Sequence, residues 1–323
     1  MCFRAMDVLS PEPSALPPLP PVEPALRPLP TATYFLFVAG LYVLLGSIAQ
    51  SWFLPLGIWW SQIFLFFVPT VLVLRARGFR PLRFLRFDRL PAGRQLLPAA
   101  LTALAVFFSA SALMAACEDI SPARWVERFD VSRILNTVHG PWQVVLFASV
   151  VVGAPLAEET VFRGYLQPAL ASRVGLQRAI LIQALLFSLV HMDPIGFLPR
   201  VLLGVAFGQL VVLTGSLWSS IFAHALNNGI STVLFFLYGP GPAGEAAPED
   251  PRWALLVSLA AGAAVYGLLV WLRRATPAPP PVPTEDETVR TAEPPRGQSL
   301  GWAAAWSAVV VFGLAALRLW VRP

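Results

Sequence analysis

The chain has 323 residues, of which 56% are hydrophobic and only 13% are charged. A soluble globular domain carries about 25% charged residues, so this composition excludes an ordinary soluble protein. Long continuous apolar runs favour helical membrane spans over the alternating strands of a β-barrel, and the net charge of +5 comes from arginines beside those runs, which does not indicate nucleic-acid binding.

The N-terminal part is predicted as a tail followed by three spans. Residues 1–30 are rich in proline, which prevents helix formation and indicates a disordered cytoplasmic tail. Within residues 31–140 the predicted spans are 33–53, 57–74 and 96–117. Seven arginines between positions 75 and 95 face a single aspartate, so this loop and the N-terminus are predicted to be cytoplasmic. The mixed charges of 118–140 fit an external segment.

Residues 141–240 are predicted to form the catalytic core. Its four spans, numbered four to seven, are 142–166, 178–191, 197–213 and 217–238. The fifth is short and stops at Asp193 and Pro194, where Asp193 is a candidate helix cap or cavity residue. The sixth carries Gly204 and Gly208 at a spacing that permits close helix contact.

Residues 241–323 are predicted to hold an eighth span at 253–272, a proline-rich linker at 275–299 and a last apolar run at 300–317. The fold prediction is therefore all-α, a polytopic transmembrane helical bundle of eight to nine spans, with the active site among spans four, five and seven. Nine spans place the C-terminus outside, whereas eight spans and an interfacial helix keep it inside. Two cysteines, Cys2 and Cys117, support neither a disulfide framework nor a metal site.

Glu158, Glu159 and Arg163 lie near the end of the fourth span, at a depth where ionisable groups are costly and usually functional. Glu159 and Arg163 are four residues apart, so they share a helix face and can pair. Glu158 points about 100° away around the helix and is left for another role. For this motif alone, the alternative is an interfacial charge cluster whose side chains reach water.

Two later spans carry polar residues that could act together with this motif. His191 ends the fifth span, with Phe187 one turn earlier, and His224 lies four residues before Asn228 in the seventh. Asn227 is the neighbour of Asn228, but helical spacing from His224 favours Asn228. A lone histidine or asparagine in a span commonly bonds a neighbouring helix.

As a set, Glu158, His191, His224 and Asn228 offer a base, an imidazole partner and two hydrogen-bond donors. Hydrolysis needs these parts, because a base activates water and fixed donors stabilise the oxyanion. The set therefore predicts an enzyme that hydrolyses a bond at membrane depth.

The three motifs are Glu-Glu-x-x-x-Arg, Phe-x-x-x-His and His-x-x-x-Asn, in this order on successive apolar helices. They resemble the CPBP family of intramembrane proteases, which includes CAAX proteases, bacteriocin-processing enzymes and Rce1-type prenyl-protein endopeptidases. The resemblance covers about residues 140–240. It implies that Glu158 activates water with help from His191, that His224 and Asn228 stabilise the oxyanion, and that Glu159 and Arg163 form a structural pair.

Two other interpretations stay open. Glu158, His191 and His224 could bind zinc as a two-histidine, one-carboxylate set in a metalloprotease, although no HExxH motif is present and the favoured mechanism requires no cofactor. A non-enzymatic scaffold or a transporter could use the same groups as a proton relay. The expected partners are the lipid bilayer and a membrane-anchored protein or peptide substrate, with no nucleic acid, and the expected location is the inner cell membrane.

Overall fold

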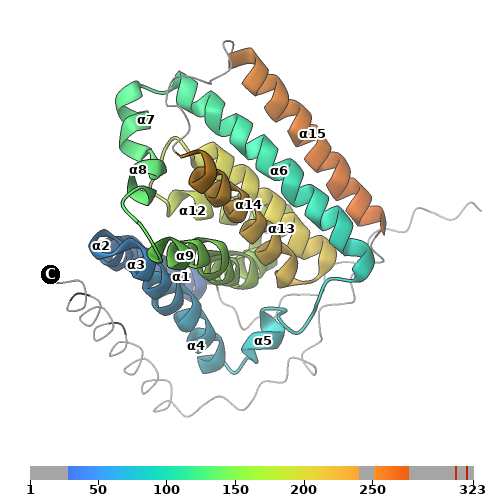
Figure 1. Cartoon of the computed structure of the whole chain (residues 1–323). Coiled ribbons are helices and arrows are strands. Elements are labelled where there is room, and N and C mark those ends of the chain that lie inside the picture. The colour runs from blue at the N-terminus through green and yellow to red at the C-terminus, as the bar shows by residue number, and fades with distance from the viewer. Residues whose placement is uncertain (1–27, 240–250, 276–309, 311–317, 319–323) are drawn as a thin grey trace, which may run out of the picture.

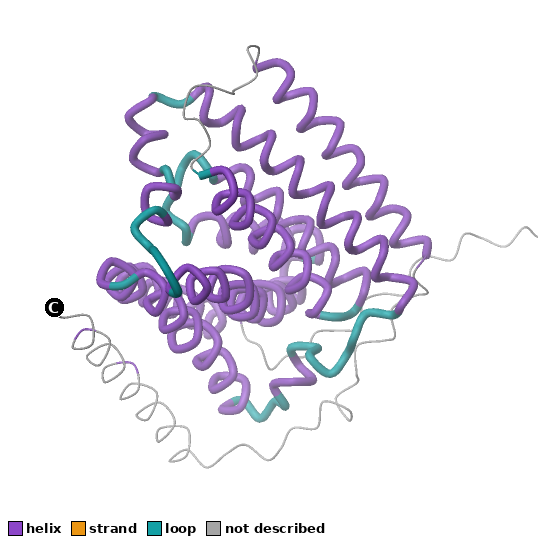
Figure 2. The backbone as a smooth tube through the Cα atoms, viewed as in Figure 1, coloured by secondary structure: helices purple, strands orange, loops and turns teal. Residues whose placement is uncertain are grey.

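The computed structural model describes residues 28–239 and 251–275, together with the isolated positions 310 and 318. The predicted tail up to residue 27, the linker from residue 276 and the last apolar run, apart from residue 310, lie outside the described residues. The predicted fold class is confirmed for the described part, which is helical and contains no strand there (Figure 2).

Six helical segments are long and apolar enough to cross a membrane, and they correspond to predicted spans one to four, six and seven. Their bounds are Thr31–Trp52, Leu54–Ala76, Gly93–Ile120, Trp142–Val174, Phe197–Thr214 and Leu217–Tyr238. The structure thus confirms six of the eight or nine predicted spans by length and composition.

The first, second and fourth of these segments each join several helical pieces. The first contains α1 (Pro28–Leu41), η1 (Tyr42–Gly46) and α2 (Ser47–Trp52), and the second contains α3 (Leu54–Ser61), η2 (Gln62–Phe67) and α4 (Val68–Ala76). The fourth contains α9 (Trp142–Ala148), η3 (Ser149–Gly153), α10 (Ala154–Glu159), η4 (Thr160–Leu166) and α11 (Gln167–Val174). The η pieces are π-helical. This form is rare in proteins overall, but where it occurs it is often at a functional site.

The remaining helices complete the bundle. They are α5 (Pro81–Phe84), α6 (Gly93–Ile120), α7 (Ala123–Phe129), α8 (Val131–Leu135), α12 (Leu176–Leu189), α13 (Phe197–Thr214), α14 (Leu217–Tyr238) and α15 (Pro251–Ala275). The long helices α6 and α15 pack along each other, and α6 also contacts α13 and α14 (Figure 1). The fourth segment lies between η2 on one side and α12 and α14 on the other, so it occupies the centre of the bundle.

The fifth predicted span is short, as expected, but it lies two residues earlier in the chain than predicted. Its helix α12 has 14 residues and ends at Leu189, two residues before His191. At 1.5 Å per residue it is about 21 Å long, which is less than the hydrocarbon thickness of about 30 Å. The eighth predicted span forms a helix of 25 residues, α15, but it is not among the six membrane-length apolar segments.

The predicted close contact at Gly204 and Gly208 is confirmed. A Cβ atom at Gly204 would lie 2.7 Å from the Cβ of Ala184, and one at Gly208 would lie 2.8 Å from Oε1 of Gln167. Only glycine therefore lets α13 approach α12 and the fourth segment this closely, and this approach brings a backbone carbonyl of α13 next to the polar residues described below.

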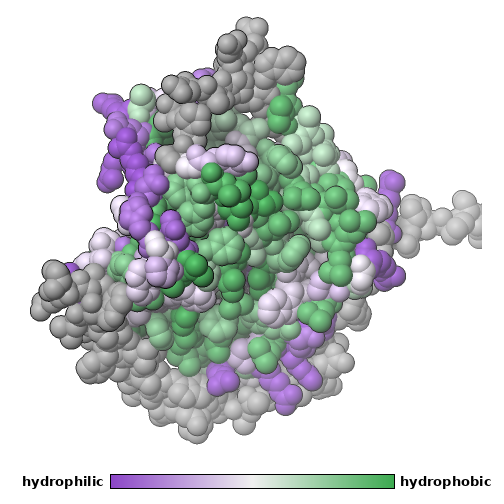
Figure 3. All heavy atoms as spheres, in the orientation of Figure 1, coloured by the Kyte–Doolittle hydropathy of each residue, from purple (hydrophilic) through white to green (hydrophobic). Residues whose placement is uncertain are grey.

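Hydrophilic residues gather at the two ends of α6, and apolar residues form a band between them (Figure 3). The helices α7 and α8 lie at one end, and the arginine-rich segment with α5 lies at the other (Figure 1). This distribution fits a bundle whose ends face water and whose middle faces lipid. Which end faces the cytoplasm stays a prediction from the arginines.

Candidate active site

Glu159, Arg163 and His224 form a buried ionic trio. Nη1 of Arg163 lies 2.9 Å from Oε1 of Glu159, and both side chains are fully buried. The same Oε1 atom accepts a hydrogen bond from Nδ1 of His224 at 2.8 Å. The predicted pairing of Glu159 with Arg163 is therefore present, and Glu159 has a second partner that helical spacing alone did not reveal.

Glu158 lies beside this trio and has different partners. Its Oε1 accepts a hydrogen bond of 2.7 Å from Nε2 of Gln62, which comes from η2 of the second span. Its Oε2 lies 3.9 Å from Nε2 of His224, too far for a direct hydrogen bond. The Glu158 side chain is buried, with 5% of the residue surface exposed.

The ring of His224 is oriented by Glu159 on one side and turned toward Glu158 on the other. Because a carboxylate only accepts hydrogen bonds, Nδ1 carries a proton in the contact with Glu159. The neutral ring then presents an unprotonated Nε2 toward Glu158, and the protonated ring presents a donor. Nε2 of His224 can consequently exchange a proton with whatever binds between it and Glu158.

Two phenylalanines pack around the charged groups. The Phe187 ring contacts the guanidinium of Arg163, whose Cζ lies 4.4 Å from the ring centroid. The Phe207 ring stacks on His224 with centroids 5.3 Å apart and lies 5.5 Å from Cζ of Arg163. These contacts hold a buried arginine against aromatic faces, which attract cations. Phe187, predicted as a supporting residue, thus contacts Arg163 directly.

Asn228 lies one turn after His224 on α14 and is tied to the fourth segment. Its Nδ2 donates a hydrogen bond of 2.9 Å to the backbone carbonyl of Val150 in η3. Asn227 donates from Nδ2 to Oδ1 of Asn228 at 3.2 Å. The two asparagines therefore have different positions: Asn228 bridges two spans, and Asn227 orients the Asn228 amide.

His191 lies in the turn between α12 and α13 rather than inside a helix. Its Nδ1 is 2.7 Å from the carbonyl oxygen of Phe187, so Nδ1 donates and Nε2 of the neutral ring is left as an acceptor. The Phe187 ring contacts both histidines, with centroid distances of 5.0 Å to His191 and 5.8 Å to His224. Unlike Glu158 and His224, His191 is exposed.

The turn that carries His191 is held by Asp193. Oδ1 of Asp193 accepts backbone hydrogen bonds from Ile195 and Gly196 at 3.0 and 3.2 Å, and Oδ2 binds Nη2 of Arg200 at 2.7 Å. Asp193 thus stabilises the turn before α13 and is not the N-cap of that helix, which is Gly196. Met192 adopts a φ of 54°, a left-handed conformation that is uncommon for a residue with a side chain.

Three glutamines of this region were not recognised in the sequence: Gln62, Gln167 and Gln183. Gln183 donates to the carbonyl of Gly204 at 2.9 Å, the same carbonyl that accepts from Nη2 of Arg163 at 3.3 Å. Gln167 donates to the carbonyl of Gly208 at 3.2 Å. A signal was available, because a glutamine within an apolar span needs a buried partner.

The zinc alternative would need three ligands close together. Among the described residues, no group of three histidine, cysteine, aspartate or glutamate side chains is placed to hold a metal ion. Nε2 of His224 lies 3.9 Å from Oε2 of Glu158, and His191 lies in the exposed turn between α12 and α13. Zinc binding by Glu158, His191 and His224 stays an alternative prediction.

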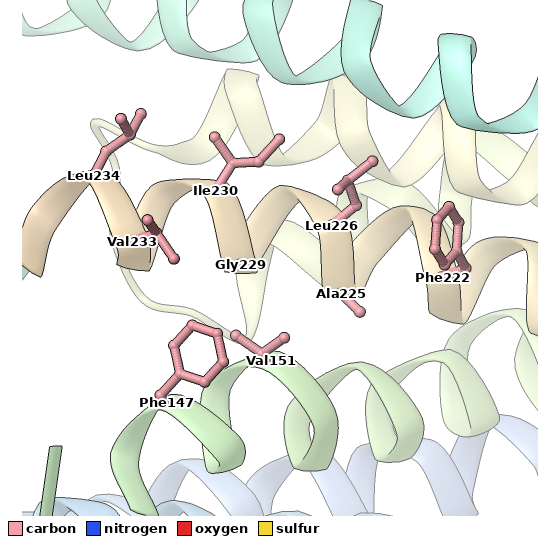
Figure 4. A pocket seen from close by; sticks show the side chains of 9 residues that line it. All are labelled: Phe147, Val151, Phe222, Ala225, Leu226, Gly229, Ile230, Val233 and Leu234. Atoms are coloured by element: carbon pink, nitrogen blue, oxygen red, sulfur yellow. The ribbon is translucent and has the colours of Figure 1, made fainter. Parts of the chain in front are cut away.

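An apolar groove of about 500 Å³ lies on the side of the bundle between α14 and the α9–η3 part of the fourth segment. Phe147, Val151 and Phe222 are among its walls, and Gly229 forms part of the α14 side (Figure 4). All of its lining residues are apolar. The groove offers no acid, base or hydrogen-bonding side chain, so it is not the candidate catalytic site.

Comparisons with known proteins match the part of the chain that holds these polar residues. Residues 140–230 match the family model for Rce1-like proteins, described as type II CAAX prenyl endopeptidase Rce1-like. The "Putative membrane peptidase YdiL" of Bacillus subtilis (strain 168) is 28% identical over 108 residues, which are 33% of this chain and 43% of that protein. No solved structure matches the chain.

The resemblance to the CPBP family is thereby confirmed over residues 140–230, which hold all three motifs. The match spans less than half of the length of the Bacillus relative. The activity, the substrate and the role of each residue remain matters for proposal.

Proposed function

We propose that this protein is an intramembrane endopeptidase of the CPBP type, in which Glu158 activates water and His224 and Asn228 stabilise the oxyanion. The observation that carries the proposal is the division between the two adjacent glutamates. Glu159 is balanced by Arg163 and bound to His224, whereas Glu158 has one oxygen bound to Gln62 and the other turned toward Nε2 of His224.

In the first step Glu158 acts as the general base. A water molecule within about 2.8 Å of both Oε2 of Glu158 and Nε2 of His224 fits the 3.9 Å separation of those atoms. Glu158 takes a proton from this water as its oxygen attacks the carbonyl carbon of the scissile peptide bond. The protonated carboxyl group then returns the proton to the leaving amine.

In the same step the carbonyl oxygen of the substrate becomes an oxyanion that needs donors. Asn228 keeps one Nδ2 hydrogen for Val150 and has a second one for the substrate. His224 donates from Nε2 when its ring carries both protons, while Nδ1 is held by the Glu159 carboxylate. Fixed donors of this kind are commonly the largest single contribution to acyl-transfer catalysis.

His191 is proposed to assist the base, as the family resemblance implies. Nε2 of its neutral ring is an acceptor, because Nδ1 donates to the Phe187 carbonyl. Phe187 links His191 to His224 through shared ring contacts.

The proposed substrate is a membrane-anchored protein or peptide that is cut in the cytoplasmic half of the inner membrane. Glu158 lies six residues, about 10 Å along a helix, before Gly164. A Cβ at Gly164 would meet Leu85, which belongs to the arginine-rich segment that is predicted to be cytoplasmic. The site therefore lies within about two helical turns of that segment.

The proposal is tested by identifying cleavage products in membranes. Cells that express the wild-type chain are compared with cells that express Glu158→Gln at the same level, and new N- and C-termini of membrane proteins are identified by mass spectrometry. We expect a set of termini that appears only with the wild-type chain. Identical termini in both samples would contradict the proposal and favour a scaffold or a transporter.

A further inference from the structure

Gln62 is the polar side chain of the second span that reaches Glu158. It lies in the π-helical segment η2, 96 positions before Glu158, and only 1% of its surface is exposed. Its Nε2 lies 2.7 Å from Oε1 of Glu158 and 3.1 Å from Oη of Tyr42. An amide nitrogen has two hydrogens, so one can go to each of these oxygens.

The orientation of this amide is fixed by its surroundings. With the opposite orientation, the carbonyl oxygen of Gln62 would face the Glu158 carboxylate, and two acceptors would be left without a proton between them. Tyr42 is itself held by the Phe66 ring, on which it stacks with centroids 4.1 Å apart and an interplanar angle of 13°. The first and second spans thus hold Gln62 in place from outside the motif region.

The hydrogen bond from Gln62 gives the two carboxylate oxygens of Glu158 different roles. It occupies Oε1 of Glu158, and it leaves Oε2 as the oxygen that faces Nε2 of His224. A carboxylate held at one oxygen cannot rotate freely about its terminal bond, so the second oxygen keeps a defined position. Loss of this defined position should slow the reaction strongly, because a shift of about 1 Å can reduce a rate about 100-fold.

We infer that Gln62 is a positioning residue, which acts through Glu158 by fixing the oxygen that takes the proton from water. The inference rests on the proposed function and extends it to a residue outside residues 140–230. Tyr42 supports Gln62 in this role through the second amide hydrogen.

The test compares Gln62→Met with the wild-type enzyme on a peptide that contains a cleavage site found in membranes. Methionine keeps the length of the side chain and removes the donor. We expect kcat to fall about 10- to 100-fold, and KM to stay within about twofold, because Gln62 does not contact the substrate in this proposal. Tyr42→Phe removes only the hydroxyl and should lower kcat less.

The matched control is Gln209→Met, which removes a glutamine hydrogen bond of 2.8 Å to Gln177 on other helices. Its kcat should equal that of the wild type. A Gln62→Met protein whose kcat equals that of Gln209→Met, in an assay where Glu158→Gln is inactive, would overturn the inference and leave the proposed function intact.

A spectroscopic measurement tests the hydrogen bond without any substrate. The infrared spectrum of Glu158→Gln subtracted from that of the wild type isolates the carboxyl bands of Glu158. The same subtraction in the Gln62→Met background should give shifted bands, because Oε1 has lost its donor. Unshifted bands would overturn the inference, whether or not the protein cleaves peptides.

Discussion

Two groups of polar side chains meet at His224 and differ in burial and in charge balance. The first, the closed group, consists of Glu159, Arg163 and Gln183, which are at most 1% exposed and contain one positive and one negative charge. The second, the open group, consists of Glu158, His191 and Asn228. Among the described residues the Glu158 carboxylate is bound by Gln62 and lies 3.9 Å from His224, and the histidine of this group, His191, is exposed.

The difference shows that adjacent charged residues in one helix can have different roles, one structural and one in the reaction. The closed group ties the fourth segment to α13 through the carbonyl of Gly204. In the open group, polar side-chain atoms stay available to contact a reactant. Substitutions in the closed group should therefore reduce stability, with an added loss of activity at Glu159 because it also orients His224. Substitutions in the open group should reduce activity in a protein that still folds.

The largest effect on folding stability is expected for Arg163→Met. It leaves Glu159 as a buried charge without its cation, which typically costs about 3–5 kcal/mol of folding free energy. Unfolding of the purified protein in detergent micelles measures this change. Arg173→Met is the matched control, because Arg173 is exposed near the end of the same segment and should change stability little. Equal stability of the two variants would contradict the role of the closed group.

Asn228→Ala should reduce activity strongly, and Asn227→Ala should reduce it weakly. Loss of one oxyanion donor costs about 100- to 1,000-fold in kcat, whereas Asn227 only orients Asn228 through a contact of 3.2 Å. Peptide-cleavage kinetics of the two variants check this. The assignment of Asn228 would be wrong if Asn227→Ala had the larger effect.

Glu159→Gln tests whether Glu159 does more than pair with Arg163. Loss of the carboxylate that orients His224 should lower kcat about 10- to 100-fold, because a displacement of about 1 Å can cost about 100-fold in rate. Glutamine keeps an oxygen acceptor and nearly the same volume, so much of the packing is retained. A variant with the kcat of the wild type would reduce Glu159 to a purely structural residue.

The smallest effect is expected for metal removal. The described residues do not form a three-ligand set, and the proposed mechanism requires no metal. Cleavage by the purified protein should proceed at an unchanged rate after treatment with a zinc chelator, and elemental analysis should find no stoichiometric zinc. Loss of activity on chelation, with recovery when zinc is added, would restore the metalloprotease interpretation.

The pairs within one helix were predictable, and the contacts between helices were not. Helical spacing correctly separated Glu158 from the Glu159–Arg163 pair, and glycine spacing correctly predicted the close approach at Gly204. The bond between Glu159 and His224 joins residues 65 positions apart, so no local pattern indicates it. Gln62 was missed for the same reason, since a glutamine in an apolar span shows only that some partner exists.

The end of the fifth span was also predicted only in part. The apolar run continues to Val190, but the turn held by Asp193 begins there, and the helix ends at Leu189. His191 is consequently exposed in a turn and does not lie on a helix face. Asp193 holds the turn through local hydrogen bonds from Ile195 and Gly196, and its second oxygen binds Arg200 of α13.

The most direct test of the division between the two glutamates is the ratio of kcat for Glu158→Gln to kcat for the wild type. It is measured on the purified proteins in lipid vesicles with a peptide that contains an identified cleavage site. Removal of the base should lower kcat about 100- to 10,000-fold, while the unfolding temperature of the variant stays close to that of the wild type. A Glu158→Gln protein that folds and cleaves at the wild-type rate would contradict the account.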